Sequence, residues 1–218
     1  MTGVQTCALP ILSDLPEDAQ TVTYLMDTCQ QAAFQTRWTA IDQLGWDRTN
    51  ALFVDHEDAA VNALFKLYPW EWLWQEAFAE FLPTAKNLFI EPPWKLLLSN
   101  KGLLPILWEL NPGHPNLLPA FTSLEASLGG NYVRKPVLSR EGANVTVVEG
   151  GVTLEENGGD YGAEGFVYQA RAAIPNFSGH RPVCGVWMVN HEACGLGLRE
   201  DTRRITGNLS RFVPHRMA

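Results

Sequence analysis

The sequence has few positive charges and no long apolar run. Its 16 Lys and Arg residues face 24 Asp and Glu residues, and the formal net charge of the 218-residue chain is -8. A chain this acidic does not attract DNA, RNA or anionic lipid through its overall field, so any anion must be held at a local site. Prolines interrupt the most apolar stretch, residues 103–119, before it approaches the ~20 residues that cross a bilayer. We therefore expect neither a nucleic-acid partner nor a membrane partner.

Cysteine is also scarce. Cys7, Cys29, Cys184 and Cys194 show neither CxxC nor Cys/His ligand spacing, which argues against a zinc site and against a disulfide framework. We expect a reducing, cytoplasmic location. The hydrophobic content of 46% and the eight tryptophans suffice for a core in one large or two small domains. The sequence does not indicate an oligomeric state.

The first residues call for separate treatment. Residues 4–11, VQTCALPI, resemble one reading frame of a common sequencing-library adapter, and processing scars are set aside before fold reasoning. We predict that residues 1–11 are not native and that the natural chain began further upstream. The opening strand of the first subdomain is then expected to be missing, which would leave apolar surface exposed and lower the stability.

The pattern up to residue 68 predicts an α/β subdomain. Acids followed by helically spaced apolar residues indicate an amphipathic helix over residues 15–34. Residues 35–41 are β-prone, residues 44–47 are expected to turn, and residues 51–54 are expected to form a second strand. Residues 12–68 are therefore interpreted as a partial α/β subdomain.

The rest of the chain changes from helix to strand. A helix is predicted from Pro69 to about Phe81, and a second one from Asn100 or Lys101. From Tyr132 the composition becomes β-rich, with five candidate strands: YVRKPVL, NVTVVE, GVTLEE, FVYQARA and RPVCGVWMVN. So many short strands in sequence predict an antiparallel sheet.

Two lysines are candidates for anion binding. Lys101 is expected at a helix start, where amide donors and the macrodipole favour an anion; the alternative is a solvated lysine beside a cap. Lys135 precedes residues 139–144, whose small and polar side chains allow a flexible hairpin tip with backbone amides that approach phosphate. The spacing of a P-loop is absent, and a surface hairpin with a solvated charge is the alternative.

Three further features allow two interpretations each. The segment FVYQARAAIP, residues 166–175, exposes backbone groups to an adenine edge or is simply a sheet edge. Arg199 suits a transferring phosphoryl group, or it pairs with a neighbouring acid such as Glu200. Tryptophans 70, 72 and 74 form a substrate wall or sugar-binding platform, or they pack in a core.

A resemblance to a known family connects these features. The stretches FKLYPWEW, EPPWKLLLSNKGLLPILWEL, YVRKPVLSREGANV, FVYQA, PNF, GVW and CGLGLREDTRRITGNLSRFVPHR occur in this order. Together they resemble the glutathionylspermidine synthase-like acid–amine ligases, an ATP-grasp family, over residues 12–216. The resemblance implies an α+β ATP-grasp fold, an antiparallel sheet with flanking helices preceded by the incomplete α/β subdomain, with residues 69–218 as the nucleotide-binding region.

The resemblance also implies a reaction. The family activates a carboxylate with ATP as an acyl phosphate, and an amine then displaces phosphate to form an amide. The implied partners are a small-molecule carboxylate and an amine of the peptide or polyamine type.

Residue roles follow position by position. Lys101 and Lys135 match the two ATP-binding lysines of the family, and Arg199 matches an arginine that stabilises the phosphorylated intermediate. The other implied nucleotide contacts are Glu141, Gly142, Gln169, Ala170, Arg171, Ala172, Ile205 and Thr206. Trp70, Glu71 and Trp72 fall in the substrate region, and Trp72 replaces a threonine that contacts glutathione, so the identity of the acid is left open.

The expected Mg²⁺ ligands of the family, an Asp, a Glu and an Asn, lie upstream of Leu12. No metal ligand is therefore expected within this chain, and because phosphoryl transfer relies on the metal, we expect the fragment alone to be inactive. Two alternatives are an ATP-binding protein without ligase activity and, more remotely, a carbohydrate-binding module.

Overall fold

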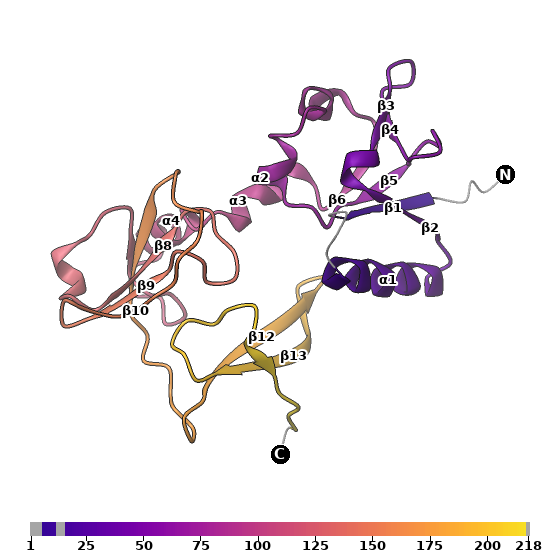
Figure 1. The fold of residues 1–218 in the computed structure, drawn as a ribbon. Coiled ribbons are helices and arrows are strands. Elements are labelled where there is room, and N and C mark those ends of the chain that lie inside the picture. The colour runs from indigo at the N-terminus through magenta and orange to yellow at the C-terminus, as the bar shows by residue number, and fades with distance from the viewer. Residues whose placement is uncertain (1–5, 12–15, 217–218) are drawn as a thin grey trace. The chain divides into compact units, whose positions relative to one another are not determined.

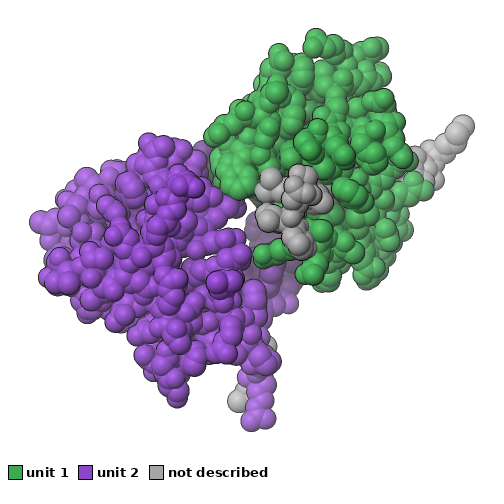
Figure 2. Space-filling view, in the orientation of Figure 1, with its two compact units in different colours: residues 1–96 green, residues 97–218 purple. Residues whose placement is uncertain are grey.

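The computed structural model describes residues 6–11 and 16–216. The chain divides into two compact units, Met1–Leu96 and Leu97–Ala218, which Figure 2 shows in different colours. In the described ranges, none of the helices combines the length and apolar character needed to cross a membrane.

The first unit contains a four-stranded parallel sheet in the order β2-β1-β5-β6. Helix α1 lies against β1 and β2 (Figure 1), and its first turn carries Glu17 and Asp18, which complement the helix dipole. The elements are β1 (Thr6–Ile11), α1 (Pro16–Gln31), β2 (Gln35–Ala40), η1 (Ile41–Gln43), β3 (Gly45–Asp47), β4 (Leu52–Val54), β5 (Ala63–Phe65), α2 (Trp70–Leu73), η2 (Ala79–Thr84), β6 (Leu88–Ile90) and η3 (Pro93–Lys95).

The α/β character of this unit is confirmed, but the expected missing strand is not observed. Residues Thr6–Ile11 form β1 in the middle of the sheet, in register with all six residues of β2 and with part of β5. The backbone of this segment therefore completes a sheet that we expected to be open. Whether residues 1–11 are native stays a prediction, and residues 1–5 lie outside the described part of the chain.

The predicted turn at residues 44–47 is wrong. Gly45–Asp47 is the strand β3, which pairs with β4 in a separate antiparallel hairpin. The chain reverses just beyond it, because the Asp47 carboxylate accepts hydrogen bonds from the backbone amides of Thr49 and Asn50. Such an Asx turn competes locally with other backbone structure.

The helix predicted from Pro69 to Phe81 is much shorter. Helix α2 ends at Leu73, and the aromatic residues that follow turn back onto the core: Phe78 packs edge-on against Phe53, and Phe81 stacks on Trp46 with ring centroids 4.8 Å apart. Aromatic residues have modest helix propensity, so tertiary packing decides the path. Residues 69–96 accordingly belong to the first unit, whereas we expected them to open the nucleotide-binding region.

Asn87 ties this core together through backbone contacts. Its buried side chain accepts a hydrogen bond from the amide of Phe53 at 2.8 Å and donates to the carbonyls of Phe53 and Val61. One side chain thus satisfies three backbone groups that lie away from water.

The second unit is built on a five-stranded antiparallel sheet, β10-β9-β8-β11-β7. Four of the five predicted strands lie in it; the fifth, RPVCGVWMVN, is β12 of another sheet, and β7 takes the remaining place. Strands β12, β13 and β14 form a second antiparallel sheet. The elements are α3 (Leu96–Ser99), α4 (Leu103–Leu110), β7 (Ala120–Phe121), η4 (Ala126–Leu128), β8 (Tyr132–Pro136), β9 (Thr146–Glu149), β10 (Val152–Glu156), β11 (Phe166–Ala170), β12 (Arg181–Val189), β13 (Glu192–Asp201) and β14 (Arg211–Phe212).

We predict that Asn87→Ala lowers the free energy of unfolding by about 3 kcal/mol, because it leaves buried backbone groups without partners at about 1–3 kcal/mol each. Chemical denaturation measures the change. Asn62→Ala is the matched control, since the Asn62 side chain is exposed and the change should stay within about 0.5 kcal/mol. Equal effects of both substitutions would contradict the role given to Asn87.

Candidate functional site

One face of the five-stranded sheet carries the candidate site. Val133 on β8 lies opposite Val147 on β9 and opposite Gln169 on β11. Successive side chains of a strand point to opposite faces, so Lys135, two residues beyond Val133, shares this face. The sheet register thus places one cation on a largely apolar surface.

Lys135 is held in an unusual environment for an ammonium group. Its Nζ donates a hydrogen bond to the side-chain carbonyl of Gln169 at 2.8 Å. Burial, and secondarily the positive charge of Lys101, lower the pKa of Lys135 below its ordinary value of 10.5. The two lysines therefore lie close enough for their charges to interact.

Lys101 reaches the same place from another segment. Its Nζ donates to the backbone carbonyl of Ser139 at 2.7 Å and to the Ser139 hydroxyl at 2.9 Å, and its backbone amide donates to Val137 at 2.8 Å. These contacts join Lys101 to the chain that leaves β8 just beyond Lys135. The ammonium group is therefore positioned by the connection between β8 and β9.

The expected place of Lys101 at a helix start is wrong. Helix α4 begins at Leu103, and Lys101 lies in the turn before it. The Asn100 side chain and backbone carbonyl accept hydrogen bonds from the amides of Gly102 and Leu103, so these amides already have partners. The side-chain charge of Lys101, not the helix dipole, is what the site can use.

Both lysines line one cavity of ≈ 360 Å³. We call it the lysine cavity, and its remaining lining residues are Leu118, Val133, Ser139, Glu141, Gly142, Val145, Val147, Gln169, Ala170, Ala172, Ile174, Arg204, Ile205 and Thr206. Of the ten residues that we predicted to contact nucleotide, only Arg171 is absent from this described lining. The lining thus combines the two lysines and Arg204 with a few polar side chains and a set of apolar ones.

The hairpin at residues 139–144 contacts the segment that follows β10, and its flexibility stays a prediction. The carbonyl of Gly142 accepts a hydrogen bond from the Asn157 side chain at 3.0 Å, and the Asn144 side chain donates to the Gly159 carbonyl at 2.8 Å. Gly142 has a φ of +74°, and a Cβ there would lie 2.7 Å from the Ile205 side chain and 2.8 Å from the Thr206 carbonyl. Only glycine allows the hairpin to pack this closely on the opposite wall.

The predicted adenine-side segment ends β11. The amide of Ala170 donates to the carbonyl of Pro119 at 2.7 Å, and that of Arg171 donates to Asn131 at 3.2 Å. Within the described chain, the amide of Ala172 has no such backbone partner. A ligand edge in the cavity would therefore meet the amide of Ala172 rather than those of the two preceding residues.

Arg199 lies outside the described lining of the lysine cavity. On β13, its Nη2 donates to the carbonyl of Gly207 at 2.6 Å and to that of Ser210 at 3.3 Å, and its guanidinium lies over the Phe212 ring. Its Nε is buried and has no partner among the described residues. As placed, Arg199 holds the loop that follows Ile205 and Thr206; the stabilisation of an acyl phosphate stays a prediction.

The predicted substrate residues belong to the first unit. Trp70 is only 2% exposed, and the Lys66 ammonium lies 4.7 Å from the centroid of its ring, so this tryptophan packs in the core and has no face for a ligand. Trp72 packs edge-on against Tyr68, and Glu71 is half-buried. The core interpretation thus accounts for Trp70 but not for Trp74, which is 41% exposed, so the platform of the carbohydrate-binding alternative loses one of its three tryptophans.

The structure adds residues that sequence reasoning missed. Val133, Val145 and Val147 share the Lys135 face, and the two-residue period of the strands could have identified them. Leu118, Ile174 and Arg204 arrive from connecting segments; Ile174 and Arg204 lie in stretches that the sequence analysis quoted, but no local pattern pointed to these individual side chains. In the described ranges, no cluster of three or more His, Cys, Asp or Glu could hold a metal ion, and Glu141 is the only carboxylate in the described lining of the lysine cavity.

Comparison with solved structures defines the class of protein. The chain matches a RimK domain protein of the ATP-grasp type from Sphaerobacter thermophilus with a TM-score of 0.51 and 13% sequence identity. The match covers 88% of this chain and 72% of the other. The fold is therefore an ATP-grasp fold, as predicted.

The family follows from the sequence comparison. The family model described as glutathionylspermidine synthase preATP-grasp matches residues 3–218. The chain belongs to this glutathionylspermidine synthase family, which confirms the resemblance. The match includes most of the segment that we predicted to be adapter-derived, without testing its origin.

Several relatives resemble the chain. A Haemophilus influenzae protein that carries the name acid–amine ligase is 45% identical over 91% of this chain and 53% of its own length. The trypanothione synthetase of Crithidia fasciculata is 27% identical over 95% of this chain, and the bifunctional glutathionylspermidine synthetase/amidase of Escherichia coli is 28% identical over 88%. The chain spans 35% of each of these two synthetases, and about half of the Haemophilus protein.

We predict that Gly142→Ala destabilises the protein more than Gly150→Ala. Both glycines have positive φ, which costs an alanine about 1–2 kcal/mol. A Cβ at Gly150 meets nothing within 4 Å, whereas one at Gly142 also clashes with the opposite wall, at about 1–3 kcal/mol more. Urea denaturation of both variants measures the difference, and equal losses would show that the hairpin does not pack as described.

We also predict that Lys135→Met raises the free energy of unfolding at neutral pH. The folded-state pKa of Lys135 is lowered, so the unfolded chain binds more protons between that pKa and 10.5. The buried charge costs its full amount below the lowered pKa, and stability recovers as the pH rises through this interval. Denaturation from pH 7 upward should show the gain of the variant shrinking; a gain that grows with pH would overturn this assignment.

Proposed function

We propose that the complete protein is an ATP-dependent carboxylate–amine ligase that forms an amide through an acyl phosphate. The observation that carries the proposal is the convergence of Lys101 and Lys135 on one cavity, beneath a hairpin that requires Gly142. Family membership and the ATP-grasp fold support it. Because the chain covers only part of its relatives, the activity of the whole protein belongs to the proposal.

The lysine end of the cavity would bind the phosphates. Two ammonium groups held close together in a partly buried site attract an anion strongly, because its charge removes their mutual repulsion. The hairpin that contains Gly142 would cover the phosphates and exclude water. In this arrangement the hydrogen bond of Lys135 to Gln169 keeps the ammonium aimed along the sheet face.

The apolar part of the cavity would bind the base. Val133 and Val147 form one wall and Ile205 lies in another, so a flat purine could lie between them. The amide of Ala172 would then donate a hydrogen bond to the edge of the ring. Neighbouring backbone groups at Gln169, Ala170 and Arg171 would set the depth to which the base enters.

Magnesium belongs to the proposal for the complete protein only. Mg²⁺ in nucleotide sites is held by one or two carboxylates together with the phosphates, and the described cavity offers Glu141 alone. The residues present therefore do not form a metal site by themselves. We expect this chain to bind nucleotide without turnover, with the Asp, Glu and Asn ligands supplied from upstream.

The substrate class is proposed from the relatives. The names glutathionylspermidine synthetase and trypanothione synthetase indicate peptide–polyamine conjugation in those proteins. We propose a small carboxylate and an amine of this type here. Trp70 would stabilise the core of the first unit and would not contact the acid. A cytoplasmic location would supply both substrates and ATP.

The test is nucleotide binding by this chain. Lys101→Met and Lys135→Met should each weaken ADP and ATP binding by about tenfold or more, because each removes a charge-assisted contact to phosphate. Lys86→Met removes the same charge from an exposed position in the first unit and should leave binding unchanged. Isothermal titration calorimetry measures the three affinities.

Binding that survives both cavity substitutions would refute the proposed site. The product of the complete gene then separates a ligase from a silent ATP-binding protein: a ligase releases phosphate only when both a thiol peptide and a polyamine are present. ATP binding without product from any acid–amine pair would support the silent alternative.

A further inference from the structure

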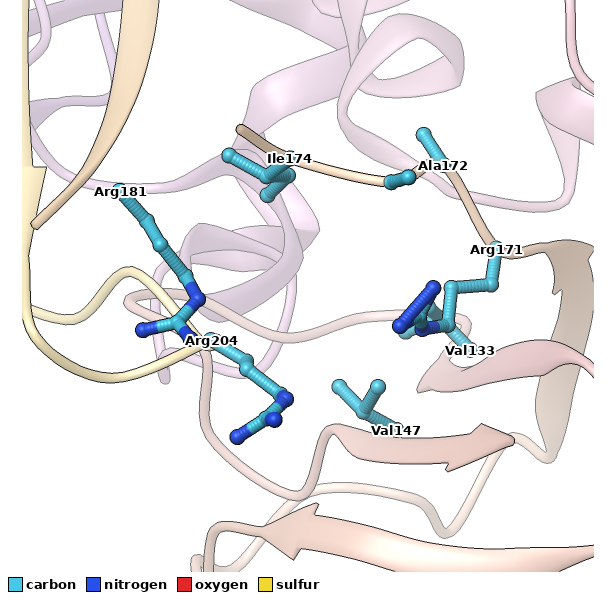
Figure 3. A pocket seen from close by; sticks show the side chains of 8 residues that line it. Val133, Val147, Arg171, Ala172, Ile174, Arg181 and Arg204 are labelled. Carbon is cyan, nitrogen blue, oxygen red and sulfur yellow. The ribbon is translucent and has the colours of Figure 1, made fainter. Parts of the chain in front are cut away.

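A second, smaller cavity lies beside the lysine cavity. Its volume is ≈ 160 Å³, and Figure 3 shows the side chains around it. We call it the arginine cavity, and its lining residues are Val133, Val147, Arg171, Ala172, Ala173, Ile174, Arg181 and Arg204. The lysine cavity shares Val133, Val147, Ala172, Ile174 and Arg204 with it. The two cavities therefore adjoin along the same sheet face.

Three arginines from separate segments meet here. Arg171 follows β11, Arg181 begins β12, and Arg204 lies in the loop after β13. In Figure 3 the side chains of Arg181 and Arg204 enter the cavity from one side, and that of Arg171 enters from the other. The fold thus gathers like charges that the sequence keeps apart.

Their existing partners leave most guanidinium donors available. Arg171 donates to the Glu149 carboxylate at 2.8 Å, and Arg181 donates to the carbonyl of Thr202 at 2.6 Å. Among the described residues, the Arg204 side chain has no hydrogen bond or ion pair. Each guanidinium carries five N–H donors, so several of them have no protein acceptor.

Nearby acids balance only part of this charge: Glu149 pairs with the Arg171 side chain, and the Glu155 carboxylate accepts a hydrogen bond from the backbone amide of Arg204. No Asp or Glu is among the described residues that line the arginine cavity, although the chain as a whole carries a net charge of -8. Arg171 is paired with Glu149, but the described residues give the guanidinium groups of Arg181 and Arg204 no carboxylate partner, so a bound anion lowers the energy of the site. The apolar floor of Val133 and Val147 strengthens this attraction, because it reduces the local dielectric constant.

We propose that the arginine cavity is a second oxyanion subsite, separate from the site of the ATP phosphates at Lys101 and Lys135. Its volume lies below the range of about 300–1,000 Å³ that holds whole small molecules, so it takes a single phosphate or carboxylate group. Planar guanidinium groups match such oxyanions through paired hydrogen bonds. The group is either part of a nucleotide phosphorylated on its ribose or a separate anion bound next to the nucleotide.

Two titrations of the 218-residue chain distinguish these sources. The first compares AMP with adenosine 2′,5′-bisphosphate and adenosine 3′,5′-bisphosphate; a preference for a bisphosphate indicates that the anion is part of the nucleotide. The second titrates inorganic phosphate into protein saturated with ADP; binding indicates a separate anion. Both titrations require that the protein binds nucleotide, and in this respect they rest on the proposed function.

Substitutions then assign the effect to the arginines. Arg204→Gln removes no side-chain contact seen in the described chain, and it should reduce the bisphosphate preference or the phosphate affinity by about tenfold. Arg181→Gln together with Arg204→Gln should abolish either effect. The affinity for ADP should change far less than in Lys101→Met.

Arg211→Gln is the charge-matched control. Arg211 pairs with Glu200 on β13 at 2.8 Å and is absent from the described lining of the arginine cavity, so its loss should leave both titrations unchanged. The proposal is overturned if neither titration detects an anion, if the double variant behaves like the parent, or if Arg211→Gln weakens binding equally. If ADP binds neither the parent protein nor any of the variants, the proposed nucleotide site is refuted instead. Titration of inorganic phosphate alone into the same proteins would then test the arginines.

Discussion

The second unit depends on keeping two ammonium groups together at one partly buried place. Lys135 lies on a sheet face with apolar neighbours, and Lys101 is fixed beside it by the carbonyl and hydroxyl of Ser139. Their repulsion lowers the pKa of Lys135 further than burial does alone. The repulsion between the two ammonium groups destabilises the free protein, and a bound polyanion removes it. The arrangement is therefore suited to binding and not to stability.

The neighbouring features follow from that constraint. The hairpin beside the lysine pair approaches the opposite wall without a side chain between them, because Gly142 packs directly on Ile205 and Thr206. The apolar walls beyond the lysines limit hydration along the sheet. In the adjoining arginine cavity the positive charges belong to arginines and not to lysines. The acidic chain therefore presents two local positive regions joined by an apolar surface.

Much of this organisation was predictable from local patterns. The series of short β-rich segments from Tyr132 onward predicted an antiparallel sheet, and acids followed by helically spaced apolar residues predicted α1. The family resemblance identified both lysines, yet the predictions failed where local and tertiary preferences differ. Phe78 and Phe81 leave the helical path because their rings find partners in the core, and the segment 6–11 fills a sheet position that we expected to be open.

The sequence by itself determined most strands of the second unit, the helix α1, the family and the residue types available for binding phosphate, because strand composition, helical spacing and motif order are local properties. The tertiary structure decided which of these residues come together in space. Arg199 donates to the carbonyl of Gly207 in the loop that follows β13, whereas the side chain of Arg204, which was not predicted as a site residue, lines both cavities. Sheet register and loop packing set these positions, and both depend on contacts between residues far apart in the chain.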